Sequence, residues 1–439
     1  MKIAIVGGGA SGMAAAYYLS KGGHLVTVFE KQSILGGHIR TINKNVKADH
    51  LNADLILEGG VIEFSSGFHT FLSLMNELDV ELAPIKIGSA IFNRDGKRYL
   101  SQDMIHKNTR GFYRLVEALK LAFVYISATG LWFRTLFERS PEFRGKTMAH
   151  YVKENRIRNA WLKLLTMYCY SIPYQKVNQV PAELALSALR NYTWADWYRI
   201  KGGVYSYIEK ILEHLNGEVI LNANITGVTR SSGGVEVIFG DGKKEFFDKV
   251  VFAVPPDQVL KLLTDPTDHE KIYFGKWQEN IAQTIVHTDT LLYQKYGITQ
   301  PSEFDFFETT DGWGYNACLN QICGLTCETR YNLSFHLDDL IEKDKIVHQF
   351  EHHTPLYTLK AFRYRDQILA SNGDQHTYHA GAYLYDGLHE GAILTGKHVA
   401  ELIDMAAHNK QEPNVALAQT LADGCEIASR AIPKAALFK

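Results

Sequence analysis

The stretch Lys2-Ile3-Ala4-Ile5-Val6-Gly7-Gly8-Gly9-Ala10-Ser11-Gly12 decides the fold of this chain. Its apolar, β-branched first half predicts a short strand, and the glycines that follow predict a tight turn. Residues 11–21 then have a helical pattern, and residues 24–29 form a second apolar run. This order predicts a β-α-β unit, which requires a right-handed crossover within a parallel sheet.

The glycines of this stretch have the spacing of a dinucleotide-binding turn. Gly7 permits the tight turn, Gly9 lets a pyrophosphate approach the backbone, and Gly12 lets the helix pack closely on the strand. The N–H groups at the helix start, including that of Ser11, are expected to face the phosphates. Glu30 ends the second strand, where a carboxylate accepts hydrogen bonds from the adenosine ribose. A bound dinucleotide is therefore predicted.

Two later segments favour FAD over NAD as that dinucleotide. Gly36-Gly37-His38-Ile39-Arg40-Thr41 has two adjacent glycines and an arginine that can pair with a phosphate. His379-Ala380-Gly381-Ala382 predicts a strand end and a turn, and a helix is expected over residues 388–406. Free N–H groups at residues 388–390 would stabilise the negative charge of a reduced flavin. A nicotinamide has no such requirement.

The rest of the chain alternates between helical and strand-like segments. Residues 110–159 and 184–191 predict helices rich in aromatic side chains. Strands are predicted at residues 218–221, 235–239 and 249–254, with Asp241-Gly242 as a hairpin turn between two of them.

With these motifs the chain resembles the flavin-containing amine oxidase superfamily, which includes monoamine oxidases, carotenoid-type desaturases, protoporphyrinogen oxidase and polyunsaturated fatty-acid isomerases. It is also similar to a bacterial group of FAD-binding oxidoreductases, often described as lipid-associated, that share His287-Thr288-Asp289 and the Gly381-Ala382-Tyr383 turn. The segments that carry the resemblance are residues 3–30, 36–41, 58–62, 201–204, 222–228, 248–255 and 380–393.

We therefore expect an α/β chain with a discontinuous Rossmann-like FAD-binding domain and an α+β substrate-binding domain, the latter a mixed sheet with a helical cap. The first domain is expected at residues 1–85, 200–265 and 375–439. The second is expected at residues 86–199 and 266–374.

The resemblance also implies which residues bind the cofactor. The ADP half would contact Gly7, Gly9, Ser11, Gly12, Glu30, Lys31 and the backbone of Ile225. The pyrophosphate, ribityl chain and flavin ring would contact Gly37, His38, Arg40, Gly60, Val61, Gly381, Leu388, His389 and Glu390. The chain departs from the superfamily at His38, where arginine is common, and at Ala382, where an acid is common. It also has no lysine between Lys276 and Lys295, where many of the oxidases hold a water at the flavin.

Aromatic side chains are expected to line the substrate space, since paired rings can hold an alkene or an amine. The candidate segments are Tyr168-Cys169-Tyr170, residues 192–198, Trp313-Gly314-Tyr315 and Tyr383-Leu384-Tyr385. Core packing is the favoured explanation for any one of these residues except Tyr383 and Tyr385, which follow the turn expected to hold the flavin. The candidate catalytic residues are Tyr383, Tyr385 and His287, the last of which is either an acid–base group or a structural histidine. No metal is predicted, because His352-His353 is interpreted as a solvated loop without a carboxylate partner.

The composition limits the location and partners of the chain. Its 439 residues exceed what one core usually supports, and a net charge of -2 gives no sign of a nucleic-acid partner. The five cysteines form a sparse set that suggests a reducing compartment, so a cytoplasmic protein is expected. The first residues do not form a secretory signal, and no apolar run is long enough for a spanning helix. The oligomeric state is left open.

The most apolar stretch is residues 121–133, between Lys120 and Arg134. We interpret it as a buried helix of the substrate domain. The alternative is a surface that touches a membrane or admits lipid, which would make the protein peripheral to the membrane.

The function expected from these features is an FAD-dependent oxidoreductase that transfers a hydride from an apolar small molecule to flavin N5. A lipid, fatty-acyl or isoprenoid substrate fits, with dehydrogenation, desaturation or double-bond isomerisation as the reaction. The alternatives are a flavin amine oxidase, an FAD-binding accessory protein without turnover and, least favoured, a nicotinamide-dependent dehydrogenase.

Overall fold

A five-stranded parallel sheet contains the N-terminal motif. The computed structural model describes residues 1–48, 51–137, 143–150, 152 and 157–408. Across the sheet the strands are, in order, β10 (Gly217–Ile220), β2 (Leu25–Phe29), β1 (Lys2–Val6), β14 (Lys249–Phe252) and β20 (Thr377–His379). Three separate parts of the sequence therefore contribute strands to this sheet: residues 2–29, 217–252 and 377–379. The strand that leads to Gly381, β20, is in the same sheet as β1, with β14 between them.

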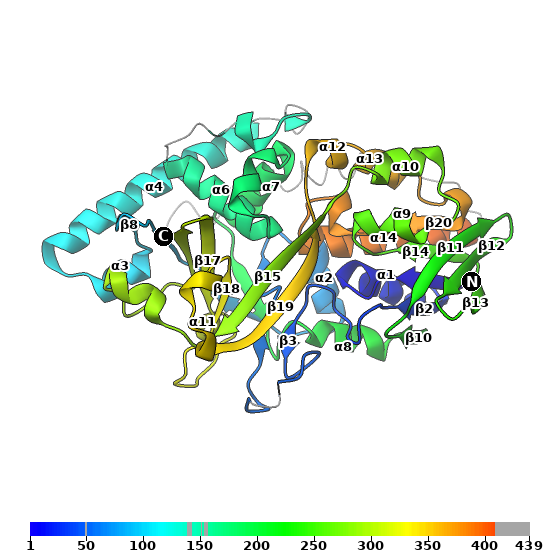
Figure 1. Ribbon diagram of the computed structural model, residues 1–439, viewed down its shortest axis with the longest axis horizontal. Helices are drawn as coiled ribbons and strands as arrows, with labels where there is room; N and C mark the ends of the chain where they lie inside the picture. The colour runs from blue at the N-terminus through cyan, green and yellow to red at the C-terminus, as the bar shows by residue number, and fades with distance from the viewer. Residues whose placement is uncertain (49–50, 138–142, 151, 153–156, 409–439) are drawn as a thin grey trace.

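Two helices from opposite ends of the described chain pack on this sheet side by side (Figure 1). They are α1 (Ala10–Lys21) and α14 (His389–Ala407). A Cβ on Gly396 would lie only 2.4 Å from the carbonyl oxygen of Ser11, so glycine is required for this close helix contact. The helix predicted at residues 388–406 is thereby confirmed and held against the dinucleotide-binding turn. Residues 409–439, assigned to the same domain, lie outside the described residues.

A small antiparallel sheet extends the first domain, with β11 (Ile225–Ser231), β12 (Gly234–Phe239) and β13 (Lys244–Phe247) in order. The Asp241-Gly242 turn joins β12 to β13, so the prediction missed one strand of the hairpin. The strand β13 begins with Lys244 and Glu245, charged residues of the kind common on edge strands, and they masked its strand pattern.

A seven-stranded mixed sheet forms the second domain. All its pairs are antiparallel except that between β7 and β16, which is parallel. In order the strands are β19 (Ile346–Pro355), β15 (Glu279–His287), β18 (Asn332–Phe335), β17 (Gly312–Cys318), β16 (Phe304–Thr309), β7 (Ser89–Phe92) and β8 (Arg98–Tyr99). The expected mixed sheet is therefore present.

Helices cover one end of this sheet: α3 (Gln102–Asn108), α4 (Gly111–Phe137), α6 (Ile157–Tyr170) and α7 (Ala182–Tyr192). Figure 1 shows α4 along the outer edge of the molecule, far from the sheet of β1. The interpretation of residues 121–133 as a buried helix is wrong, because Phe123, Ile126 and Phe133 are more than half exposed. Among the described residues, no helix combines the length and the apolarity needed to cross a bilayer.

Short elements join the two domains. A three-stranded sheet pairs β5 (Phe64–Ser65) and β6 (Leu82–Ile85) with β9 (Trp197–Ile200), which straddles the expected domain boundary at residue 200. The other helices and strands are β3 (Thr41–Ile42), β4 (Leu57–Glu58), α2 (His69–Glu77), α8 (Ser206–Glu213), α9 (Pro256–Leu262), α10 (Asp268–Phe274), α11 (Leu319–Ile322), α12 (Leu359–Phe362) and α13 (Arg365–Ala370).

Candidate flavin-binding site

The turn between β1 and α1 has the geometry that its glycines predict. Gly7 has a φ of +111°, and its N–H donates to the carbonyl of Phe29 at 2.8 Å. A Cβ on Gly12 would lie 2.0 Å from the carbonyl oxygen of Gly7. No side chain caps α1, and its first helical bond runs from Met13 N to Gly9 O. The N–H groups that precede this bond, including those of Ser11 and Gly12, are the ones a helix offers to an anion.

A second glycine loop lies directly against the first. Gly36 N donates to Gly8 O at 2.9 Å, and Gly9 and Gly36 form a parallel bridge. A side chain on Gly37 would be crowded, because its Cβ would lie 3.0 Å from Gly9 Cα. A Cβ on Gly9 would make only an ordinary van der Waals contact, with Gly37 Cα at 3.7 Å. Gly9 is therefore not required by packing within the protein, which leaves close approach of a ligand as the reason for glycine there.

Glu30 lies where the adenosine ribose is expected. Its Oε2 accepts from Gly8 N and its Oε1 from Gln32 N, each at 2.9 Å, and the side chain is 7% exposed. Ala223 N donates to the Glu30 carbonyl at 2.8 Å, so the segment leading to Ile225 runs beside it. The exposed Lys31 follows directly. The residues predicted for the ADP half are thus brought together around one turn.

The segment from His38 to Arg40 is paired with the segment predicted to face the flavin. Gly59 N donates to Arg40 O at 2.7 Å, and Val61 N to His38 O at 3.3 Å. Gly60 lies between them, and a Cβ there would be 2.0 Å from His38 O. Two loops that are separate in the sequence therefore form one continuous wall.

Arg40 is a buried cation with capacity for an anion. Its Nη2 donates to Gln32 Oε1 at 2.7 Å and its Nη1 to Ile39 O at 3.2 Å. Burial lowers the pKa of Arg40, and the charge of Glu30 partly opposes that effect. A guanidinium has five N–H donors, so these two bonds leave three for a phosphate. Arg40 therefore fits the pyrophosphate that the glycine loops would hold.

The residues around His38 differ from the expectation. His352 is 5% exposed on β19, where its Nε2 lies 2.9 Å from Thr284 Oγ1, and burial lowers its pKa to about 3. His353 Nε2 lies 3.1 Å from both carboxylate oxygens of Asp257. The interpretation of His352-His353 as a solvated loop without a carboxylate partner was therefore wrong. Asp257, Glu279 and His353 bring donor atoms within 4.8 Å of one another, and the hydrogen bond between His353 and Asp257 accounts for two of the three.

The start of α14 is less open than predicted. Asp386 Oδ1 accepts from Leu388 N at 2.8 Å and from Gly391 N at 3.1 Å. The carboxylate of Glu390 accepts from Thr70 N at 2.7 Å and from Phe71 N at 2.9 Å, so it caps the start of α2. Its side chain is engaged away from the flavin, and any role in flavin binding is left to its backbone N–H.

His389 is held as a neutral side chain. Its Nε2 lies 2.9 Å from the hydroxyl of Tyr207, and its ring packs at 5.2 Å from those of Phe64 and Phe71. Burial lowers the pKa of His389 to about 3. Gly381, the other residue expected near the ribityl chain, donates its N–H to Thr395 Oγ1 at 3.0 Å and so connects β20 to α14.

The three candidate catalytic residues lie in different surroundings. Tyr383 is 3% exposed and packs edge-on against Trp277 at 5.4 Å, and within the described structure its hydroxyl has no hydrogen-bond partner. Burial raises its pKa. Tyr385 is half-buried at the end of the same turn. These two tyrosines remain candidates.

His287 has the contacts of a structural histidine. It is fully buried at the end of β15, with Nε2 3.1 Å from Asn316 Oδ1 and 2.9 Å from Ser334 Oγ. Its Nδ1 accepts from Asp289 N at 3.1 Å. Burial lowers the pKa of His287 to about 4. With both ring nitrogens engaged inside the second sheet, the structural alternative is favoured over the catalytic one.

A buried carboxyl group among aromatic rings was missed by sequence reasoning. Glu63 is 6% exposed, its Oε1 accepts from the hydroxyl of Tyr168, and its Oε2 has no partner in the described structure. The ring of Tyr168 lies 5.1 Å from that of Tyr315 and 4.8 Å from that of Phe304. Burial raises the pKa of Glu63 to about 8. The available signal was its position two residues after Val61, since alternate residues of an extended chain share a face.

Known proteins show similarity to most of the chain. The family model described as flavin containing amine oxidoreductase matches residues 10–283. The L-amino acid dehydrogenase of Synechocystis sp. is 26% identical over 290 residues, 60% of this chain and 57% of that protein. The 4,4'-diapolycopen-4-al dehydrogenase of Metabacillus indicus is 26% identical over 290 residues, 57% of this chain and 55% of that protein. A thiamine thiazole synthase of Pyrococcus horikoshii is 37% identical, but only over 99 residues, 21% of this chain and 39% of that protein. The chain thus spans about 40–60% of these curated relatives.

Solved structures share the fold over nearly the whole chain. Wild-type putrescine oxidase bound to putrescine has a TM-score of 0.63 at 16% identity, covering 92% of this chain and 99% of that one. The CLA-producing fatty acid isomerase from P. acnes has a TM-score of 0.64 at 17% identity, covering 91% of this chain and 97% of that one. The family match covers more than half of the chain, and the glycine loops, Glu30 and Arg40 fit the cofactor of that family. The chain belongs to the flavin containing amine oxidoreductase family.

Proposed function

We propose that the enzyme takes a hydride from an apolar organic substrate of the lipid, fatty-acyl or isoprenoid class. Dehydrogenation, desaturation and double-bond isomerisation all begin with this step. The observation that carries the proposal is a cluster of aromatic side chains, Tyr168, Phe304 and Tyr315, around the buried carboxyl group of Glu63. Tyr192 and Trp197 extend this cluster, with ring centroids 4.7 Å apart.

The residues described above fit FAD, which supplies hydride acceptance at flavin N5 when it is bound. Gly9, Gly37 and Arg40 would hold the pyrophosphate, and Glu30 would hold the ribose. The rings of Tyr168, Tyr315 and Phe304 would orient an apolar chain and exclude water from the reacting carbon.

The charge state of Glu63 supports an uncharged substrate. A pKa of about 8 leaves the carboxyl group mostly protonated at neutral pH, where it donates a hydrogen bond but carries no charge. A neutral carboxyl group suits the carbonyl, carboxyl or hydroxyl oxygen of a lipid and gives an ammonium little attraction. Two proteins similar to this chain are named for such substrates, a fatty acid isomerase and a diapolycopenal dehydrogenase.

An amine oxidase is the second candidate. An ionised Glu63 surrounded by aromatic faces would bind an ammonium through an ion pair and cation–π contacts. The similarity of the fold to putrescine oxidase is consistent with this alternative. The absence of lysine between Lys276 and Lys295 weighs against it, because many of the oxidases use a lysine near the flavin.

Anaerobic reduction of the bound flavin distinguishes the two candidates. We expect the visible flavin absorbance to bleach with an unsaturated fatty acid or an isoprenoid, and to persist with primary amines and diamines. In the matched variant Glu63→Gln, an uncharged donor remains, so bleaching by an apolar substrate should persist. Bleaching by amines that is lost in Glu63→Gln would establish the amine oxidase instead. A flavin that stays oxidised with every donor would indicate an accessory protein without turnover.

The same proposal includes a cytoplasmic location and contact with a membrane that supplies the substrate. The four cysteines in the described part of the chain are all free, as expected in a reducing compartment. Fractionation of cells followed by detection of the protein in the cytosol or at the cytoplasmic membrane tests this location.

A further inference from the structure

Helix α4 exposes a continuous apolar face. Its outward side chains recur at intervals of three, four and, for the last, seven residues, so they lie on one side of the helix. They are between 51% and 74% exposed: Phe112, Leu115, Leu119, Phe123, Ile126 and Phe133. Six large apolar side chains exposed on one side of a helix are unusual on a monomeric protein and mark an interaction surface.

The opposite side of α4 holds the helix on the protein. Glu117 and Ala128 are buried, and Leu121 and Val124 are half-buried on the same side. This face packs against α3, α6 and α7. The apolar outward face is therefore additional to the residues needed to fix the helix, and Figure 1 shows the helix at the outer edge where that face can meet a partner.

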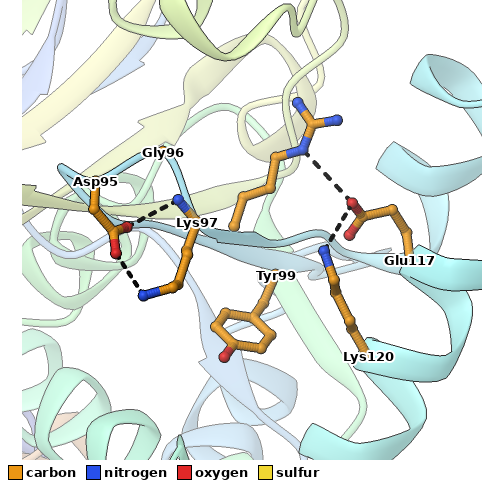
Figure 2. A pocket seen from close by; sticks show the side chains of 7 residues that line it. Asp95, Gly96, Lys97, Tyr99, Glu117 and Lys120 are labelled. Atoms are coloured by element: carbon orange, nitrogen blue, oxygen red, sulfur yellow. Dashed lines mark hydrogen bonds and ion pairs between the residues drawn. The ribbon is translucent and has the colours of Figure 1, made fainter. Parts of the chain in front are cut away.

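Cations are concentrated in the segment that leads into α4 and in the first turns of that helix. Residues 94–120 contain seven lysines and arginines and three carboxylates, in a chain whose net charge is -2. Figure 2 shows a pocket of about 480 Å³ in this region, where Lys97 pairs with Asp95 at 2.7 Å and Lys120 pairs with Glu117 at 3.2 Å. Arg98 Nε lies 3.8 Å from the same Glu117, so one carboxylate serves two cations. The segment that ends in the first turns of α4 therefore carries an excess of positive charge.

An apolar groove lies beside the face. It has a volume of about 560 Å³ between α3 and α4, and its lining includes Ile105, Leu115, Leu121 and Tyr125. The ring of Tyr125 lies 6.0 Å from that of Trp194, which is 58% exposed. Tyrosine and tryptophan with apolar bodies and polar tips are enriched where protein meets lipid headgroups.

We propose that the α4 face, defined as Phe112, Leu115, Leu119, Phe123, Ile126 and Phe133, lies on the surface of a membrane that contains anionic lipids. The apolar side chains enter the boundary between headgroups and acyl chains, and the surrounding cations contact the headgroups. The helix lies along the surface and does not cross it. A second copy of the chain is a poorer occupant, because a twofold contact would bring the same cation-rich segment, residues 94–120, close to its own copy.

Vesicle sedimentation with the FAD-loaded protein tests this proposal and needs no substrate, so its outcome is independent of the proposed reaction. We expect binding to vesicles of phosphatidylcholine with phosphatidylglycerol, weaker binding to phosphatidylcholine alone, and weaker binding as salt increases. Ile126→Asp should reduce the bound fraction about tenfold, since it places a charge in the apolar boundary. Ile272→Asp is the matched control, because Ile272 is also an exposed isoleucine but lies on α10.

Retention of flavin and an unchanged melting temperature establish that both variants are folded. The proposal is overturned if the folded wild-type protein stays in solution with anionic vesicles. It is also overturned if Ile126→Asp and Ile272→Asp bind equally well. A concentration-dependent dimer that is lost in Ile126→Asp, without vesicle binding by the wild type, would assign the face to a second copy instead.

Discussion

Replacement of Glu30 by glutamine separates the structural role of this side chain from its role in binding. The carboxylate accepts one backbone N–H on each oxygen, from Gly8 and from Gln32, both at 2.9 Å. The amide of glutamine has one oxygen, so one of these buried N–H groups loses its acceptor. Leaving a buried donor unsatisfied costs about 1–3 kcal/mol. The free energy of unfolding of the apoprotein should fall by this amount in Glu30→Gln.

Binding of FAD should be weakened separately. The ribose hydroxyls would lose a charged acceptor, which costs about 1–3 kcal/mol of binding free energy and raises the Kd of FAD about 5- to 150-fold. Urea unfolding of the apoprotein gives the first quantity, and titration of the apoprotein with FAD, followed by flavin fluorescence, gives the second. Glu81→Gln is the control, since Glu81 is an exposed carboxylate whose one ion pair among the described residues is with Lys201. A folded Glu30→Gln protein with the wild-type Kd would place the ribose elsewhere and refute the assignment.

Three further substitutions test the site and its surroundings. Gly9→Val should abolish flavin retention while the apoprotein still folds. Gly12→Ala should instead destabilise the apoprotein by about 1–3 kcal/mol, because the new Cβ meets the Gly7 carbonyl. Urea unfolding and FAD titration of both variants distinguish the two effects. The raised pKa of Glu63, about 8 in the folded protein against 4.5 in the unfolded chain, predicts that wild-type stability falls as the pH rises through this range. Glu63→Gln should lose less stability between about pH 5 and pH 8, and equal losses in urea unfolding would contradict the burial of a protonated carboxyl group. His287→Leu should lower the free energy of unfolding by about 1–3 kcal/mol, because the hydrogen-bond partners of His287 are left unsatisfied. The rate of flavin reduction should be unchanged. A slower rate in stopped-flow experiments would support the catalytic role of His287 instead.

The dinucleotide-binding turn could be predicted from the sequence because its requirements are local. Gly7, Gly9 and Gly12 are needed for a positive φ, for ligand approach and for helix packing within one β-α-β unit, and Glu30 follows at the end of the next strand. These constraints act over about thirty residues and leave a fixed spacing. Glycine has no Cβ, so its pattern directly records where backbone or ligand must come close.

Side chains whose partners are far away in the sequence could not be predicted in this way. Glu63 meets Tyr168 across 105 positions, and Glu390 caps the helix at Thr70 across 320. Sequence position made Glu390 a flavin contact, but the packing of α14 beside α2 directs its carboxylate to another helix start. A carboxylate accepts hydrogen bonds wherever the fold brings unsatisfied N–H groups, and nothing in its own segment identifies them.

The chain by itself determined that residues 121–133 form an apolar helix, and it determined the parallel sheet, the glycine loops and the cofactor class. Only the tertiary structure decided which side of that helix packs on α3, α6 and α7 and which side is exposed. Apolar side chains on both sides of a helix give the same pattern in the sequence whether the outer side meets protein, lipid or water. The burial of a side chain depends on which other segments of the chain pack against it. These contacts join residues far apart in the sequence, so no single segment determines them.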